Sequence, residues 1–105
     1  MRVVREEIFG PVLCAMRIDN DDLETIAALA NDSDYGLSAY VWTRDISMAH
    51  QLVRKIRSGT VRVNGGTGFD AALSYGGYGQ SGWGRENGKE GIEAFLETKS
   101  VSIAL

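Results

Sequence analysis

The stretch that decides the fold is LSAYVWTRDISMAHQLVRKIRSGTVRV, residues 37–63. Short apolar runs at its two ends, residues 37–42 and 60–63, are typical of strands. Between them, Asp45 can cap a helix whose apolar stripe recurs at helical spacing. The stripe consists of Ile46, Ala49, Leu52, Val53 and Ile56. We expect Gly59 to end this helix in a left-handed conformation. Strand, helix and strand at this spacing predict a right-handed crossover between parallel strands.

Two further elements are expected upstream. Residues 12–18 form a nearly unbroken apolar run, the pattern of a strand that is covered on both faces. Asp21 and Glu24 have the spacing of a capping box, which predicts a helix over about residues 21–31. The expected fold is therefore α/β: a three-layer, largely parallel sheet with flanking helices, plus a C-terminal edge strand that can pair with another subunit.

The glycine-rich part of the chain follows, with 11 of the 13 glycines lying between Gly59 and Gly91. Residues 77–82 match GxGxxG, but the preceding AALSYG is a poor strand, so we interpret them as a turn-rich loop and not as a dinucleotide fingerprint. Asn87 and Glu90 suggest another capping box and a last helix. Residues 101–105 alternate like an edge strand, which needs a partner.

Composition excludes several classes of function. The chain has 105 residues, net charge −3, one cysteine and one histidine, so we expect one domain without a metal site or an internal disulfide. The basic cluster Arg54, Lys55 and Arg57 lies where cations offset a helix dipole, which argues against nucleic-acid binding. No apolar run approaches 18 residues and no export leader is visible, so we expect a cytoplasmic protein without a membrane span.

The individual residues that could carry chemistry are interpreted as structural. Cys14 stands in an apolar run and is expected to be a small buried residue, not a nucleophile. His50 is expected to be an ordinary helix residue at the edge of the apolar stripe. The large aromatics are expected in the core: Trp42, Tyr78, Trp83 and Phe95.

Glu7 and Phe9, in EEIFGP, allow two interpretations. A carboxylate can accept hydrogen bonds from a ribose diol, and an aromatic ring can pack on a planar heterocycle. Residue chemistry alone favours the alternative, a solvated glutamate and a core phenylalanine, because Glu-x-Phe is a common sequence.

Four ordered blocks carry a family resemblance. They are EEIFGPV (residues 6–12), ALANDSDYGLSAYVWTRD (28–45), GTVRVN (59–64) and YGGYGQSGWGRENGKEGIEAFLETKSV (75–101). In this order and spacing they resemble the C-terminal part of NAD(P)-dependent aldehyde dehydrogenases. The resemblance spans nearly the whole chain.

The resemblance implies roles for four residues. Glu7 matches the glutamate that holds the nicotinamide ribose, and Phe9 matches a phenylalanine near the nicotinamide ring, which reverses the preference stated above. Phe69 and Tyr75 resemble positions that line the aldehyde pocket. Departures from the family pattern occur at Arg62, where tryptophan is usual, at Ser74 and Tyr75 in place of Pro-Phe, and at Gly79, where lysine is frequent.

The resemblance also implies what this sequence lacks. The nucleophilic cysteine, the oxyanion donors, the general-base glutamate and the Rossmann half lie upstream in the family, so no catalytic residue is assigned here. Residues 1–105 are expected to be a C-terminal segment of the catalytic domain, with an oligomerisation strand at about residues 99–105. We expect a homo-oligomer, dimer or higher, that is inactive alone and binds NAD(P) weakly. The alternatives are a non-enzymatic self-associating α/β module and a fragment that complements a truncated dehydrogenase.

Overall fold

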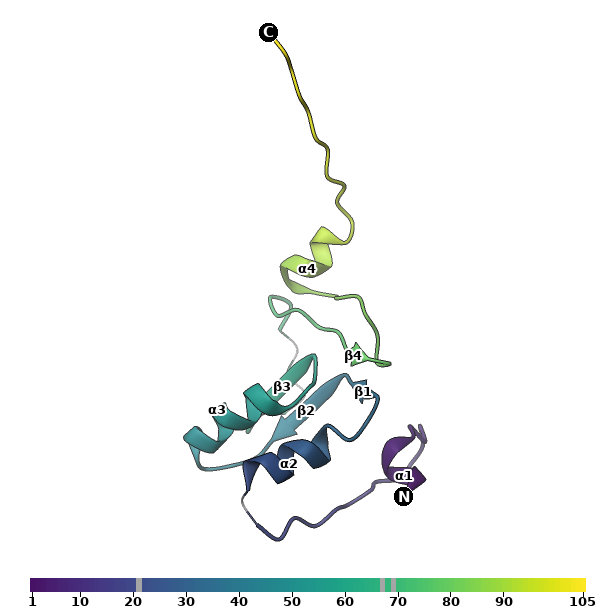
Figure 1. The fold of residues 1–105 in the computed structure, drawn as a ribbon, viewed down its shortest axis with the longest axis vertical. Helices are drawn as coiled ribbons and strands as arrows, with labels where there is room; N and C mark the ends of the chain where they lie inside the picture. The colour runs from purple at the N-terminus through teal and green to yellow at the C-terminus, as the bar shows by residue number, and fades with distance from the viewer. Residues whose placement is uncertain (21, 67, 69) are drawn as a thin grey trace.

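The structure, a computed structural model, describes residues 1–20, 22–66, 68 and 70–105 (Figure 1). In chain order its elements are α1 (Arg2–Arg5), α2 (Leu23–Ala30), β1 (Tyr35–Gly36), β2 (Ser38–Val41), α3 (Ile46–Lys55), β3 (Thr60–Val63), β4 (Tyr78–Gly79) and α4 (Gly88–Glu93). None of the helices in this described part is long and apolar enough to span a bilayer.

The centre of the fold is the unit β2–α3–β3. β2 and β3 are parallel, as the sequence predicts, and they pair with Ser38 opposite Thr60 and Val41 opposite Val63. α2 packs beside α3 near this sheet (Figure 1). The small core consists of Ala27, Val41, Ala49 and Leu52, which come from α2, β2 and α3. Because Val41 is buried while Tyr40 is exposed, β2 has one inner and one outer face.

Helix α3 begins as predicted and ends earlier than predicted. The Asp45 side chain accepts hydrogen bonds from the backbone N–H groups of Ser47 (2.8 Å) and Met48 (3.1 Å). The helix ends at Lys55 and is followed by Ile56 as the C-cap, whose backbone is extended, and Gly59 has no left-handed φ. The expectation for Gly59 as the helix terminator was therefore wrong.

Helix α2 begins one residue later than its predicted capping box. Asp22, not Asp21, is the N-cap, and its side chain accepts a hydrogen bond from the backbone N–H of Thr25 (3.0 Å). Asp21 itself lies outside the described residues. The hydrogen bond that the Asp22 carboxylate accepts from the Thr25 hydroxyl lowers the pKa of Asp22, because it stabilises the charged form.

Two asparagines connect the ends of neighbouring elements. Asn31 donates from Nδ2 to the Lys55 carbonyl (2.8 Å) and accepts from the Arg57 N–H (2.8 Å), which ties the end of α2 to the end of α3. Asn64, at φ +50°, bonds in the same way to both backbone groups of Thr43, at 2.9 and 2.7 Å. The two Asn64 hydrogen bonds connect the residues that follow the C-terminal ends of β2 and β3.

Residues 77–82, expected to be a turn-rich loop, contain the two-residue strand β4 followed by a turn, and Gly79 and Gly82 have positive φ as expected. β4 pairs antiparallel with β1, and Gly79 at its end has φ +56°. The Arg85 guanidinium donates to the carbonyls of Gly77 (3.0 Å) and Gly84 (2.7 Å) and lies 5.6 Å from the centre of the Tyr78 ring. The GxGxxG match therefore lies in a strand and turn and does not lead directly into a helix.

Helix α4 begins after the predicted N-cap residue, but this residue does not make the predicted capping hydrogen bond. Asn87 stands at the N-cap, but its φ is +58° and its side chain makes no capping hydrogen bond. The capping box with Glu90 was therefore wrong. α4 ends at Glu93, and Phe95 beyond it is exposed.

Several expectations of burial and pairing were wrong. Residues 12–18 form no strand, and Cys14 is exposed. The four aromatics expected in the core are also exposed, and Trp83 is 97% exposed.

Residues 97–105 are extended and point away from the rest of the chain (Figure 1). The described strands form two sheets of two strands each, one parallel and one antiparallel, so the third layer and the pairing of the C-terminal strand stay predictions.

Candidate functional site

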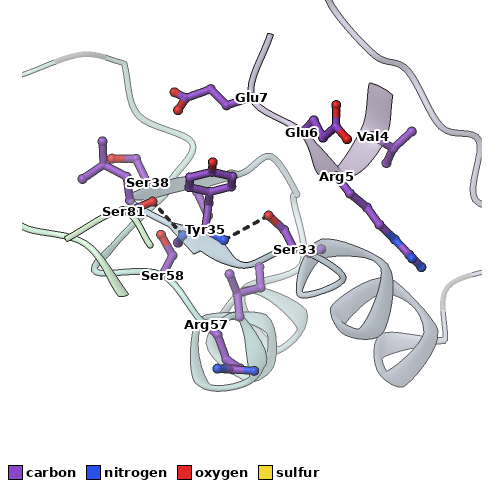
Figure 2. A pocket seen from close by; sticks show the side chains of 15 residues that line it. Val4, Arg5, Glu6, Glu7, Ser33, Tyr35, Ser38, Arg57, Ser58 and Ser81 are labelled. Atoms are coloured by element: carbon purple, nitrogen blue, oxygen red, sulfur yellow. Dashed lines mark hydrogen bonds between the residues drawn. The ribbon is translucent and has the colours of Figure 1, made fainter. Parts of the chain in front are cut away.

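A hollow of about 390 Å³ lies between the N-terminal segment and the β1–β2 region (Figure 2). Residues 4–7 form one wall, and β1, the start of β2 and the residues after α3 form the other. Its lining includes one expected site residue, Glu7.

Serine side chains surround this hollow. Ser33 and Ser81 accept hydrogen bonds from the backbone N–H groups of Tyr35 (3.1 Å) and Gly36 (3.0 Å), so both hydroxyls fix β1 (Figure 2). Ser58 donates to the Thr60 carbonyl (3.1 Å). Since a hydroxyl both donates and accepts, Ser33 and Ser81 each keep a donor for a polar ligand.

Among the charged groups of the N-terminal wall, Glu7 differs from its neighbours. Glu6 is paired with Arg2 (2.8 Å), and their hydrogen bond raises the pKa of Arg2. Arg5 is paired with Asp32 (2.7 Å). Glu7 has no ion-pair partner among the described residues and is exposed. Its carboxylate is therefore available to accept hydrogen bonds from a diol.

Phe9 lies outside the hollow. Its ring is 92% exposed and its φ is +50°, so the interpretation of Phe9 as a core residue was wrong. A left-handed φ is uncommon for a bulky residue. It turns the chain between Glu7 and Pro11, and the ring is left free to contact another molecule or another part of a larger fold.

Tyr75 lines a second hollow, of about 470 Å³, on the side of the parallel sheet that carries Tyr40. Its backbone pairs with Glu86 in an isolated bridge, with hydrogen bonds of 2.8 and 2.7 Å. Phe69, the other expected pocket residue, lies outside the described residues. Glu7 and Tyr75 therefore line different hollows.

Two residues of the second hollow were not recognised as a pair from the sequence. Arg62 and Tyr40 are direct neighbours across β2 and β3, and the guanidinium carbon lies 5.9 Å from the ring centre. Arg62 also donates to the Gly66 carbonyl (3.1 Å). The sequence predicts two parallel strands here but not their register, and it is the observed register that places Tyr40 opposite Arg62.

Two of the described residues have the chemistry that a ribose and a flat heterocycle require, although only Glu7 lines the hollow. The free carboxylate of Glu7 and the exposed ring of Phe9 suit a ribose and a flat heterocycle. The glycine-rich turn after β4 does not suit a pyrophosphate, which binds at a helix N-terminus that follows a strand. Within the described part of the chain, no group of three or more His, Cys, Asp or Glu residues could hold a metal ion.

Comparison with known proteins gives a consistent result. Residues 1–101 match the aldehyde dehydrogenase family. The chain is 48% identical, over 96% of its length, to an NADP/NAD-dependent aldehyde dehydrogenase of Escherichia coli, of which it covers 20%. It is 50% identical, over 96% of its length, to a 3-succinoylsemialdehyde-pyridine dehydrogenase of a Pseudomonas species, again covering 20%.

Solved structures agree over nearly the whole chain. An indole-3-acetaldehyde dehydrogenase of P. syringae, solved with NAD+, superposes with a TM-score of 0.90 at 43% identity, over 100% of this chain and 21% of the other. A betaine aldehyde dehydrogenase of Staphylococcus aureus, also with NAD+, gives 0.87 at 43% identity, over 94% and 20%. The chain thus spans about a fifth of the length of these relatives.

Proposed function

Because this chain belongs to the aldehyde dehydrogenase family, we propose that it is the C-terminal segment of an oxidoreductase that acts on aldehydes with NAD(P). Relatives described as NAD(P)-dependent and structures solved with NAD+ support the choice of cofactor. The observation that carries the proposal for this chain is the unpaired carboxylate of Glu7 beside a polar hollow.

Within that proposal, Glu7 accepts hydrogen bonds from the hydroxyls of the nicotinamide ribose. Phe9 packs near the nicotinamide, and Tyr75 and Phe69 belong to the aldehyde pocket. NAD(P), when bound, supplies the hydride acceptor. The residues of this chain bind and orient the cofactor and the aldehyde. We assign no catalytic residue to the chain, because the nucleophile, the base and the oxyanion donors belong to the part of the fold that it does not span.

We therefore predict that the purified chain does not oxidise aldehydes. The test measures reduction of NAD+ and of NADP+ at 340 nm with several aldehydes, and uses a complete dehydrogenase as a positive control. Turnover by the chain alone, after host enzymes have been removed, contradicts the proposal.

We also predict weak cofactor binding by the isolated chain. One ribose contact and one ring contact do not offset an association cost of about 4–15 kcal/mol. Calorimetric titration with NAD+ is expected to give a dissociation constant well above the micromolar range, and Glu7→Gln is expected to weaken the residual binding further. A micromolar constant for the unmodified chain speaks against this assignment.

A second candidate function is supported by the exposed, extended C-terminal segment, residues 97–105. Val101 and Ile103 are exposed, and no described residue makes a hydrogen bond or ion pair with residues 97–105. As a module that self-associates through residues 99–105, the chain forms a cytoplasmic homo-oligomer in which a neighbour supplies the missing layer of the sheet. Light scattering that finds a strict monomer at high concentration speaks against this function.

A further inference from the structure

Two of the four asparagines of this chain stand directly before a glycine, as Asn64–Gly65 and Asn87–Gly88. In such a pair the backbone nitrogen of the glycine can attack the side-chain carbonyl carbon of the asparagine, because glycine has no Cβ that hinders the approach. The new C–N bond closes a succinimide ring, and the side-chain nitrogen leaves as ammonia together with the proton of the glycine N–H. Water then opens the ring at either carbonyl and gives aspartate or isoaspartate.

At Asn64 the structure holds the side chain that must be attacked. Its Oδ1 accepts a hydrogen bond from the Thr43 N–H (2.9 Å), and its Nδ2 donates to the Thr43 carbonyl (2.7 Å). The N–H of Gly65, by contrast, makes no hydrogen bond with any described residue. The nitrogen of this pair is therefore available, but two hydrogen bonds must open before the side chain can turn towards it.

At Asn87 the arrangement is reversed. Its side chain makes no capping hydrogen bond and is bonded to no other residue in the described part of the chain. The N–H of Gly88 donates to the carbonyl of Ala71, a residue of the loop between β3 and β4 (2.9 Å). One hydrogen bond therefore protects this pair, and the asparagine side chain is already free to turn.

The two pairs also differ in the stability of their surroundings. Asn87 stands at the start of α4, which has only six residues, none of them buried. Helices this short are marginal without packing, and helix ends open locally far more often than a core does. Asn64 continues β3 beside β2, and its N–H donates to the carbonyl of Val41, a core residue (2.9 Å). Local opening thus favours reaction at Asn87.

We propose that Asn87 is a site of spontaneous deamidation in the folded chain, and that the two hydrogen bonds to Thr43 protect Asn64 from the same reaction. The inference does not depend on the proposed function. Asn87 lines the second hollow, so either product adds a negative charge there. In the isoaspartate the main chain runs through the former side chain, and the carbonyl that accepts the Gly91 N–H (2.9 Å) becomes part of a carboxylate. The start of α4 is then expected to loosen.

The test uses the unmodified chain, incubated at mildly alkaline pH, both folded and in guanidinium chloride. Cleavage after Arg85 separates the two asparagines, and mass spectrometry follows aspartate and isoaspartate at each site over time. In the folded chain we expect Asn87 to react at least about fivefold faster than Asn64, because one hydrogen bond must open instead of two. In denaturant we expect similar rates, since both sites are then unprotected Asn-Gly pairs.

Asn87→Gln is the matched control. Its longer side chain would have to close a larger ring, so we expect no reaction at position 87 and an unchanged rate at Asn64. Circular dichroism establishes that the variant and the unmodified chain are equally folded. Hydrogen exchange compares the Gly91 amide in fresh and aged chain, and we expect faster exchange in the isoaspartate form.

A folded chain in which Asn64 reacts as fast as Asn87 overturns the proposal, and so does a folded chain in which Asn87 stays intact. If Asn87 has the same advantage in denaturant, the local sequence explains the difference, and Thr43 has no protective role. Formation of aspartate without isoaspartate at position 87 excludes the succinimide route.

Discussion

Gly59 shows how closely the backbone segments approach one another at the start of β3. A Cβ atom at this position would lie 1.6 Å from the carbonyl oxygen of Gly76, so only glycine fits without movement of the backbone. The Gly59 N–H also donates to the Gly36 carbonyl (3.0 Å). One missing side chain therefore allows three loops to meet at the same place.

We predict that Gly59→Ala destabilises the chain by about 2–4 kcal/mol, because the backbone of the glycine-rich loop must move away. Gly66→Ala is the control, since a Cβ there meets nothing within 4 Å, and its effect is expected to stay within about 0.5 kcal/mol. Urea unfolding followed by circular dichroism measures both. Equal stability of the two variants contradicts the close approach at Gly59.

Asp22 gives a prediction of pH dependence. Its pKa is lower in the folded chain, mainly because of the hydrogen bond from the Thr25 hydroxyl. Its contribution to stability is therefore present above the unfolded value of about 3.9 and is lost as the pH falls through the lower folded value. In Asp22→Asn the cap does not titrate, so we expect the unmodified chain to lose stability relative to this variant below about pH 4. Urea unfolding between pH 2 and 6 tests this, and parallel curves over the whole range contradict it.

The elements that the sequence predicts well are those whose partners lie inside the chain. Val41 of β2 and Ala49 and Leu52 of α3 are buried, and α3 contacts both α2 and β2, so periodicity and capping residues are sufficient to find these elements although Ile46 and Val53 of the stripe are exposed. The strand at residues 12–18 and the burial of Trp83 were wrong for one common reason. Their apolar side chains find no partners in the described part of the chain.

The candidate site was predictable only in part. Glu7 and Phe9 came from the family resemblance, since Glu-x-Phe has no distinctive chemistry of its own. The serines around the hollow could not be predicted, because Ser33, Ser58 and Ser81 are brought together by the pairing of β1 with β4 and by the end of α3. Such pairings of two-residue strands leave almost no periodic signal in a sequence.

The cap of α3 offers a test at the scale of one element. Asp45→Ala removes both acceptor contacts at the helix N-terminus and is expected to destabilise the chain by about 1 kcal/mol. Asp45→Ser is expected to retain most of the stability, because a serine hydroxyl also caps. Thermal and urea unfolding provide the comparison. If Asp45→Ala and Asp45→Ser are destabilised equally, the Asp45 carboxylate stabilises the chain in a way other than capping α3.

The whole molecule is much less compact than its length predicts. Its radius of gyration is 18.2 Å, whereas a compact domain of this length has a value of about 13 Å. The extended residues 97–105, which point away from the rest of the chain, contribute to this difference (Figure 1). A surface of this kind is suited to be covered by other parts of an assembly.

Removal of residues 97–105 tests the role of the C-terminal strand. Since these residues make no hydrogen bond or ion pair with the described part of the chain, their removal is expected to change the free energy of unfolding by less than about 0.5 kcal/mol. Self-association, measured by sedimentation, is expected to decrease. Unchanged self-association places the contact elsewhere, and a large loss of stability contradicts the absence of internal contacts.

The extents of 70 × 33 × 26 Å also affect how the size of this molecule is measured. A rod-like particle diffuses more slowly and elutes earlier from a sizing column than a sphere of equal mass. A single copy calibrated against spherical standards therefore has the apparent mass of a larger species. Mass determinations that do not depend on shape are needed to count the copies in solution.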